Sequence, residues 1–325
     1  MNRVLTDEVI EKAVLLAGRA PSLHNSQPWR WEFNGTSLRL FSVPGRMLPS
    51  ADPSGREMLI SCGITLDHLH AAMAAAGWRT IITRFPEPTR LRHLATVTFR
   101  PSPIVTEGER ERADAIVRRH SDRLPFAAPT GWAEFETVLR STFEPEDALL
   151  DVLSAEARTS LASASRLASS LRRYDSWYQA ELRWWAGHTV AAAGIPRAAL
   201  ISQEEYKRVD IGRKFPTVIG EPRRTEVTAD DSAVLVLSTD RDTPQELLRC
   251  GEVLSTVLLE CTIAGYATCP LSHLTEVPQS RAIVRRLTGR TQLPQVLIRV
   301  GNVPESAEDA PPTPRLPLSD ILTRS

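Results

Sequence analysis

The sequence predicts an α+β protein made of two related halves. Shifting the chain by 188 residues places Gly63 on Gly251 and keeps the segment Leu59–Thr80 in register, with seven of its 22 positions identical. Ordinary composition predicts only about one or two identities in such a stretch. Segments rich in β-branched residues, Ala95–Arg100 and Gln295–Gly301, follow the two copies and are typical of strands. The alternative is a chance likeness between two helices rich in small residues.

Each copy of the repeat predicts one helix. Apolar residues recur at spacings of three and four from Leu59 to Ala76, which indicates a helix of about sixteen residues. A glycine follows each copy, Gly77 in the first and Gly265 in the second, as is common just past the end of a helix. We place the two halves at residues 1–105 and 106–325.

Charge and composition exclude several classes of function. The 325 residues include 39 Lys and Arg and 39 Asp and Glu, so the formal net charge is zero. A neutral chain has no overall basic field to attract nucleic acid or an anionic membrane. No apolar run reaches the roughly 20 residues of a membrane-spanning helix. We therefore expect a soluble protein with neither nucleic-acid nor membrane partners.

The N-terminus and the cysteines indicate a cytoplasmic protein. Asp7, Glu8 and Glu11 stand among apolar residues at helical spacing, which favours a first helix over a secretory signal. No CxxC pair and no histidine at metal-ligand spacing accompany the cysteines, so we expect neither disulfides nor a metal site. Buried neutral thiols are expected instead at Cys62, Cys250, Cys261 and Cys269.

An insertion at about residues 155–226 has no counterpart in the first half. It begins as a helix rich in Ser, Ala, Leu and Arg, passes into the aromatic run Tyr174–Trp185, and breaks at Gly194 and Pro196. Two interpretations stay open: a lid over a ligand, or a pair of core helices. The tail after Gly301 is rich in proline, so we expect it to be extended and to wrap over the surface.

Ser, His, Asn and Gln gather in the string Ser22–Trp29, between the first helix and a predicted hairpin at Trp29–Phe41 that turns at Asn34-Gly35. Asn and Gln carry both donors and acceptors, which suits the edge of a heteroaromatic ring. The alternative is a set of turns that satisfy their own backbone.

Arginines and a hydroxyl gather in a second string, Arg118–Arg123, at the end of an amphipathic helix. Arginine binds phosphate through paired hydrogen bonds and stays charged, so the string is a candidate phosphate site. The alternative is a solvated basic helix end that interacts with the helix dipole.

These strings resemble those of the nitroreductase-like flavoproteins, which bind FMN at a homodimer interface. Arg119-His120-Ser121-Asp122-Arg123 is similar to the family's Arg-x-Ser-x-Lys/Arg string, and Ser22–Trp29 to its Ser-x-x-Asn-x-Gln-Pro-Trp string, in reversed chain order. Thr313–Pro317 resembles the family's basic C-terminal string, although Thr313 stands where lysine is common.

The resemblance implies roles for individual residues. Arg119, Ser121 and Arg315 are expected to hold the FMN phosphate. Arg123 is expected to face the pyrimidine edge of the flavin, where a cation stabilises the negative charge of the reduced ring. The remaining expected cofactor contacts are Ser22, Asn25 and Gln27 from the first string and Pro270, Leu271 and Ser272 near nitrogen 5. Ser272 and His273 replace the acidic residue and glycine that the family carries there, and no side chain is expected to act as a catalytic acid or base.

The repeat suggests that two family subunits are fused in one chain. Only one copy of each string is present, so the chain is expected to be a monomeric intramolecular pseudo-dimer with one FMN. Such an arrangement looks like the Acg subgroup, an actinobacterial branch tied to dormancy responses, in which a central insertion covers the flavin as a lid.

Three functions follow from the resemblance. The first is an FMN-dependent oxidoreductase that carries a hydride from NAD(P)H to an electron-poor small molecule. The second is storage of FMN under a closed lid with little turnover. The third, and least favoured, is a regulatory protein that has lost its flavin. Fold and cofactor alone do not decide between them.

Overall fold

Two sheets with helices between them make up the computed structural model, which describes residues 4–87, 89–187, 192–304 and 312–324. The first sheet has the strand order β3-β4-β2-β1-β9 and the second the order β5-β6-β8-β7. The strands of the first sheet are β1 (Trp29–Phe33), β2 (Ser37–Ser42), β3 (Trp78–Arg84), β4 (His93–Pro101) and β9 (Leu322–Arg324). Those of the second are β5 (Leu149–Leu153), β6 (Ala233–Thr239), β7 (Ala267–Leu271) and β8 (Leu293–Gly301).

The two sheets repeat one topology. In each, a strand pair precedes a long helix and two more strands follow it, with every neighbouring pair antiparallel except β1 with β9. Even an irregularity recurs, because the register of β2 with β4 shifts at Leu40/Phe41 and that of β6 with β8 shifts at Leu237/Ser238. The α+β class, the hairpin and both expected strands are confirmed, while the boundaries of the two halves remain a prediction.

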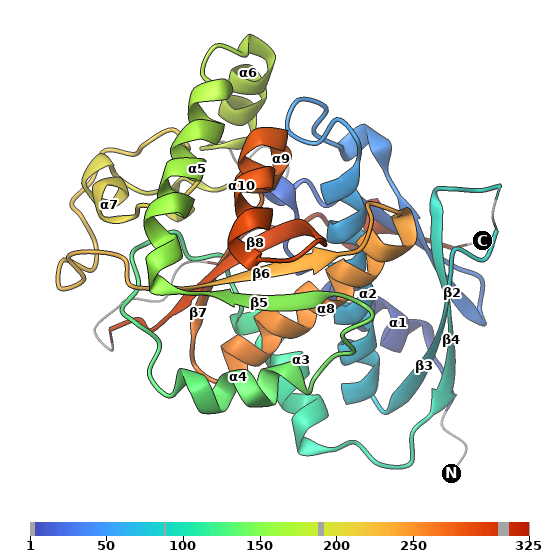
Figure 1. Cartoon of the computed structure of the whole chain (residues 1–325). Coiled ribbons are helices and arrows are strands. Elements are labelled where there is room, and N and C mark those ends of the chain that lie inside the picture. The colour runs from blue at the N-terminus through green and yellow to red at the C-terminus, as the bar shows by residue number, and fades with distance from the viewer. Residues whose placement is uncertain (1–3, 88, 188–191, 305–311, 325) are drawn as a thin grey trace.

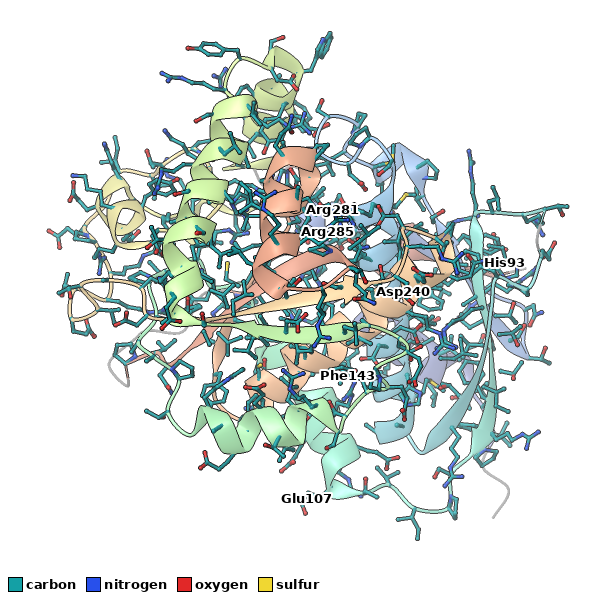
Figure 2. The ribbon with its side chains drawn as sticks, in the orientation of Figure 1. His93, Glu107, Phe143, Asp240, Arg281 and Arg285 are labelled. Atoms are coloured by element: carbon teal, nitrogen blue, oxygen red, sulfur yellow. The ribbon has the colours of Figure 1, made fainter. Side chains whose placement is uncertain are left out.

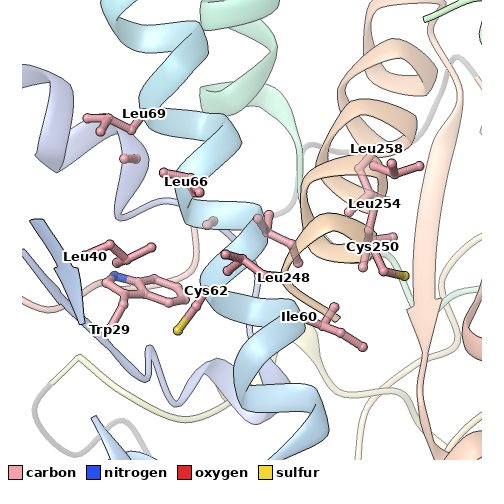
Figure 3. Packing of buried hydrophobic residues seen from close by; sticks show 14 of the residues in the cluster. Trp29, Leu40, Ile60, Cys62, Leu66, Leu69, Leu248, Cys250, Leu254 and Leu258 are labelled. Carbon is pink, nitrogen blue, oxygen red and sulfur yellow. The ribbon is translucent and has the colours of Figure 1, made fainter. Parts of the chain in front are cut away.

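The long helices α2 (Arg56–Ala75) and α8 (Pro244–Ile263) lie between the sheets (Figure 1) and cross at the aligned glycines. A Cβ on Gly63 would lie 2.0 Å from the Leu248 carbonyl oxygen, so only glycine permits this approach. Figure 3 shows Trp29 of the first sheet on one side of α2 and Leu248 of α8 on the other. α2 is apolar enough to cross a membrane by composition, but 67% of its most apolar window is buried, so it is a core helix.

The sequence analysis did not predict β3, β5, β6, β7 and β9, and two of these strands carry a signal against strand structure. β3 follows α2 directly, but its sequence WRTIITR alternates only weakly and most of its residues are partly exposed. β7 follows α8 and contains Pro270, which cannot donate to a ladder. The structure accommodates this proline because β7 lies at the edge of its sheet.

The remaining helices cover the outside of the core. The N-terminal helix is confirmed as α1, and all four cysteines are free and buried, as expected. The α-helices outside the repeat are α1 (Asp7–Ala17), α3 (Glu107–Arg118), α4 (Trp132–Arg140), α5 (Arg158–Leu171), α6 (Ser176–Trp185), α7 (Gln203–Arg208), α9 (His273–Glu276), α10 (Pro278–Thr288) and α11 (Leu318–Ile321). Short 3-10 helices occupy Leu23–Asn25, Pro44–Arg46, Ala155–Ala157 and Arg197–Ala199.

The insertion leaves the second sheet between β5 and β6, the place where β1 and β2 make a tight turn in the first sheet. It carries α5, α6 and α7. Its aromatic run does not cover a pocket as a whole, because Trp177 and Trp184 on α6 are 80% and 67% exposed. Tyr178 is buried, against Leu48 and Ala51 of the first half.

The C-terminal tail does more than wrap over the surface. Residues 305–311 lie outside the described part of the chain, but beyond them α11 leads into β9, which pairs in parallel with β1. Ile321 is 1% exposed and belongs to the main core. The expectation of a purely surface tail was wrong, because Ile321 packs into the core and the strand Leu322–Arg324 adds to the edge of the first sheet.

Candidate functional site

A pocket of about 1000 Å³, open mouth included, lies where the first string, the repeat helices, β7 and the insertion meet. Of the expected cofactor residues, the pocket wall includes Ser22, Ser121, Arg123, Pro270, Leu271 and Ser272. Residues 201–215 of the insertion supply its roof, through Ile201, Tyr206, Val209, Gly212, Arg213 and Phe215.

The Arg119–Arg123 string reaches the pocket because it runs beside β7. Ser121 and Thr268 form a parallel bridge, and the Asp122 amide donates to the Thr268 carbonyl at 2.9 Å. Residues of two predicted regions, 119–123 and 270–272, thus become neighbours. Arg123 then projects beneath the insertion, where it donates to the Ala199 carbonyl at 3.2 Å and lies 5.2 Å from the Phe215 ring centroid.

Three arginines that have no carboxylate partner lie close together; none lines the pocket, but two of them are two residues along the chain from Pro21 and Ser121 of its wall. Arg119 is 4% exposed, and its Nε and Nη1 have no hydrogen-bond partner. Arg315 donates to the Arg19 carbonyl at 2.9 Å, and the Nε atoms of Arg19 and Arg315 are also buried without a partner. Within the described chain none of the three forms an ion pair. We call Arg19, Arg119 and Arg315 the arginine cluster.

The arginine cluster is electrostatically strained. Burial and repulsion from Arg19 lower the pKa of Arg119 to about 10. Burial and repulsion from Arg119 and Arg19 lower the pKa of Arg315 to about 9. Since buried charges are normally paired, this uncompensated group is a candidate site for an anion. At neutral pH the guanidiniums are protonated, so the cluster attracts an anion there, and this attraction weakens as the pH rises through about 9, where Arg315 loses its proton.

The first string adopts an unusual backbone. His24, Asn25 and Gln27 all have positive φ angles, of 49°, 60° and 49°. This conformation is uncommon for residues other than glycine and clusters at binding sites. Ser22 Oγ closes the loop by accepting from the Gln27 amide at 2.9 Å.

Asn25 and Gln27 join three segments of the chain. Asn25 Nδ2 donates to the carbonyls of Gly194 and Pro314, at 3.0 and 3.1 Å, so both of its protons are used. Gln27 Nε2 donates to the Ala192 carbonyl, and its Oε1 accepts from the Leu316 amide at 2.9 Å. Neither residue lines the pocket. They hold the tail that carries Arg315, and Asn25 Oδ1 remains buried without a partner, as a free acceptor.

Several residues of the site were missed from sequence. Arg19 belongs to no recognisable sequence motif, and only the folded chain brings it beside Arg119 and Arg315. His24 lines the pocket at 5% exposure with both ring nitrogens unpartnered. Burial, with Arg213 and Arg123 nearby, lowers the pKa of His24 well below its usual value, so the ring is neutral. The Nδ1 atom of His68 lies 2.8 Å from Ser255 Oγ, and its Nε2 is buried without a partner.

Several carboxylates fasten the insertion to the rest of the chain, and two of them, Glu276 and Glu181, lie on the side of α6 and α9. Arg213 of the insertion pairs with Glu276 of α9 and donates to Ser272 Oγ at 2.9 Å. Glu181 of α6 accepts from the amides of Ser50 and Ala51, at 3.0 and 2.9 Å.

Replacing Glu181 by alanine is expected to loosen α6. The change removes two charge-assisted hydrogen bonds, and a loss of about 2 kcal/mol corresponds to roughly 30-fold faster local opening. Amide hydrogen exchange over residues 176–185 measures this. The matched control is Glu204→Ala, whose carboxylate is exposed and pairs only with Lys207. Unchanged exchange in α6 would show that this contact does not fasten the insertion.

Fold and site together define a class: an α+β protein whose pocket is roofed by an insertion and adjoins an uncompensated cluster of arginines. No protein-family model matches the chain. A Mycobacterium tuberculosis protein named "Putative NAD(P)H nitroreductase acg" is 50% identical over 319 residues, covering 98% of this chain and 96% of that protein. The chain therefore belongs to the NAD(P)H nitroreductase family, as the resemblance indicated.

Further similar proteins come from the same organism and from solved structures. An uncharacterized protein of Mycobacterium tuberculosis is 52% identical over 318 residues, covering 97% of this chain and 92% of that protein. The FMN-dependent nitroreductase NfnB from Mycobacterium smegmatis, solved in complex with NADPH, is 16% identical with a TM-score of 0.43 and covers 67% of this chain and 100% of that chain.

Proposed function

We propose that the chain is an FMN-dependent oxidoreductase that takes a hydride from NAD(P)H and passes it to an electron-poor small molecule. The observation that carries the proposal is the arginine cluster, whose buried guanidinium nitrogens have no carboxylate partner and lie near the pocket. Relatives named as NAD(P)H nitroreductases support the same activity.

The residues present fit the FMN group. Arg119 and Arg315 offer unpartnered guanidinium nitrogens to a phosphate, with Arg19 as a third cation. Asn25 Oδ1 offers an unpartnered acceptor to a ribityl hydroxyl. Ser22, Arg123 and the segment Pro270–Ser272 would enclose the ring, and Ser121, expected at the phosphate, lies on the same pocket wall. When bound, FMN supplies hydride transfer; the chain supplies binding, orientation and charge.

The protein's architecture suits one such site in each chain. The matched topology of the two sheets supports an intramolecular pseudo-dimer with halves at residues 1–105 and 106–325. On this proposal the chain works as a cytoplasmic monomer with one FMN, and the insertion is a lid fastened through Arg213 and Glu181.

An anaerobic visible spectrum of the purified protein tests the proposal. We expect flavin bands at one FMN per chain, bleached by NADPH and restored by an electron-poor acceptor. Bleaching by dithionite alone would favour storage of FMN under the insertion. A colourless protein that does not take up added FMN would exclude both.

A further inference from the structure

A second pocket, with a basic wall, lies on the insertion beside the pocket that we propose for the flavin. It measures about 1210 Å³ with its open mouth included. Its wall includes five cations, Arg172, Arg173, Arg183, Arg213 and Lys214. Among the described residues of this wall, Glu276 is the only carboxylate. The helices α5 and α6 stand beside α9 and α10 (Figure 1), and their side chains project into solvent at this end of the molecule (Figure 2). We call this pocket the basic pocket.

The carboxylates on and near the wall of the basic pocket are already engaged. Glu276 pairs with Arg213. Asp175 pairs with Arg172 and accepts from the Tyr178 amide at the start of α6. Glu181 of α6 accepts from two backbone amides of the first half, as described above. These three carboxylates therefore leave the other cations of the basic pocket without a counter-charge.

Three cations of the basic pocket are unpaired. Arg173, Arg183 and Lys214 have exposed side chains, and in the part of the chain that the structure describes none of them forms an ion pair. Three positive charges thus face one pocket of a chain whose formal net charge is zero. Such a concentration of cations attracts a ligand with several negative charges, and arginine and lysine both bind phosphate.

The basic pocket and the flavin pocket share part of their walls. Arg213, Phe215 and His273 line both pockets. His273 is 3% exposed, with Nε2 2.9 Å from Ser165 Oγ and with Nδ1 buried without a partner, so one polar atom at this wall is left for a ligand. Phe215 is half-buried and apolar, so its side chain can turn aside without leaving a polar atom of its own unpaired.

The proposed reaction needs a second site for phosphate. In the proposed function the arginine cluster binds the phosphate of FMN, so the phosphates of the nicotinamide donor need other cations. NADPH carries a pyrophosphate and a 2′-phosphate, and one ribose separates its pyrophosphate from its nicotinamide. Phosphates held in the basic pocket would therefore leave the nicotinamide at the shared wall, beside the flavin pocket.

We propose that the basic pocket binds the phosphates of NADPH and selects this donor over NADH. The inference rests on the proposed function. Arg173, Arg183 and Lys214 supply the charges that attract the pyrophosphate and the 2′-phosphate. NADH lacks the 2′-phosphate and gains less from the same cations, so it is the weaker donor.

Calorimetric titration of the FMN-loaded protein with 2′-phospho-ADP-ribose tests the site without turnover. This probe carries the phosphates of NADPH but no nicotinamide. In the double variant Arg183→Gln/Lys214→Gln we expect roughly 10-fold weaker binding, because two charge contacts to phosphate are lost. The matched control is Arg100→Gln/Arg110→Gln, which removes two exposed arginines of β4 and α3, away from the insertion (Figure 1). The control should bind the probe as the wild type does.

The FMN content of both double variants shows whether the fold is intact. A wild-type protein that does not bind the probe would overturn the proposal, and so would an Arg183→Gln/Lys214→Gln protein that binds it with wild-type affinity. Inorganic tripolyphosphate is titrated in parallel. If it binds as tightly as the probe, the basic pocket is a general polyphosphate site and its assignment to NADPH is wrong.

Steady-state kinetics separate this inference from the proposed function. In Arg183→Gln/Lys214→Gln we expect the KM for NADPH to rise roughly 10-fold and the KM for NADH to rise less. If the variant keeps the wild-type KM for NADPH, the proposed function stands and the donor binds elsewhere. If the wild-type protein binds the probe but NADPH does not bleach its flavin bands, the proposed function fails and the basic pocket remains a phosphate site.

Discussion

Replacing Arg119 by methionine is expected to weaken FMN binding about 100-fold while leaving the fold intact. Arg119 is buried and offers two unpartnered nitrogens, Nε and Nη1, to the proposed phosphate. Two hydrogen bonds between charged groups contribute on the order of 3 kcal/mol, and each 1.4 kcal/mol is a factor of ten in affinity. Methionine keeps much of the side-chain volume, and the cofactor-free variant should be at least as stable because it lacks an uncompensated charge.

Fluorescence titration of the cofactor-free protein with FMN and with riboflavin measures this effect. Riboflavin lacks the phosphate, so its affinity should change little. The neighbouring Arg118→Met is the matched control, since Arg118 lies on the same helix with an exposed side chain. FMN affinity should also fall as the pH rises through about 9, where Arg315 loses its proton. Equal losses for FMN and riboflavin would mean that Arg119 does not bind the phosphate.

Replacing Gly63 by alanine is expected to destabilise the protein by more than about 3 kcal/mol, the upper part of the range for overpacking a core. The new Cβ would lie 2.0 Å from the Leu248 carbonyl oxygen and 2.8 Å from the Gly251 Cα. Both are backbone atoms of α8, so no side-chain rotation relieves the clash and the two helices must separate. The core between the sheets, shown in Figure 3, would open with them.

Urea unfolding followed by circular dichroism measures the loss of stability. Gly251→Ala should lower the stability to a similar extent, because its Cβ would lie 2.1 Å from the Ile60 carbonyl oxygen. Gly108→Ala is the control: this glycine is also helical, but nothing lies within 4 Å of its Cβ position, and alanine there should be neutral or stabilising. A Gly63→Ala protein as stable as the wild type would contradict the close crossing.

Much of the fold could be predicted because its signals are local. The helices of the repeat, the hairpin at Asn34-Gly35 and the strands β4 and β8 follow from periodicity, turn residues and β-branched runs within short windows. The Arg119–Arg123 string and the Asn25 and Gln27 string were recognisable for the same reason. β3 and β7 were not, since a strand that is partly exposed or that carries a proline is identified by its neighbours in the sheet rather than by its own pattern.

The sequence by itself determined the class of fold, the repeat and the family. Only the tertiary structure decided which charges meet. Arg19, Arg119 and Arg315 lie at three distant places in the chain, and Arg213 of the insertion pairs with Glu276 of α9 only in the folded chain. Whether a buried charge is paired or unpaired depends on contacts between residues far apart in sequence. That balance gives the site its chemistry, and local patterns do not encode it.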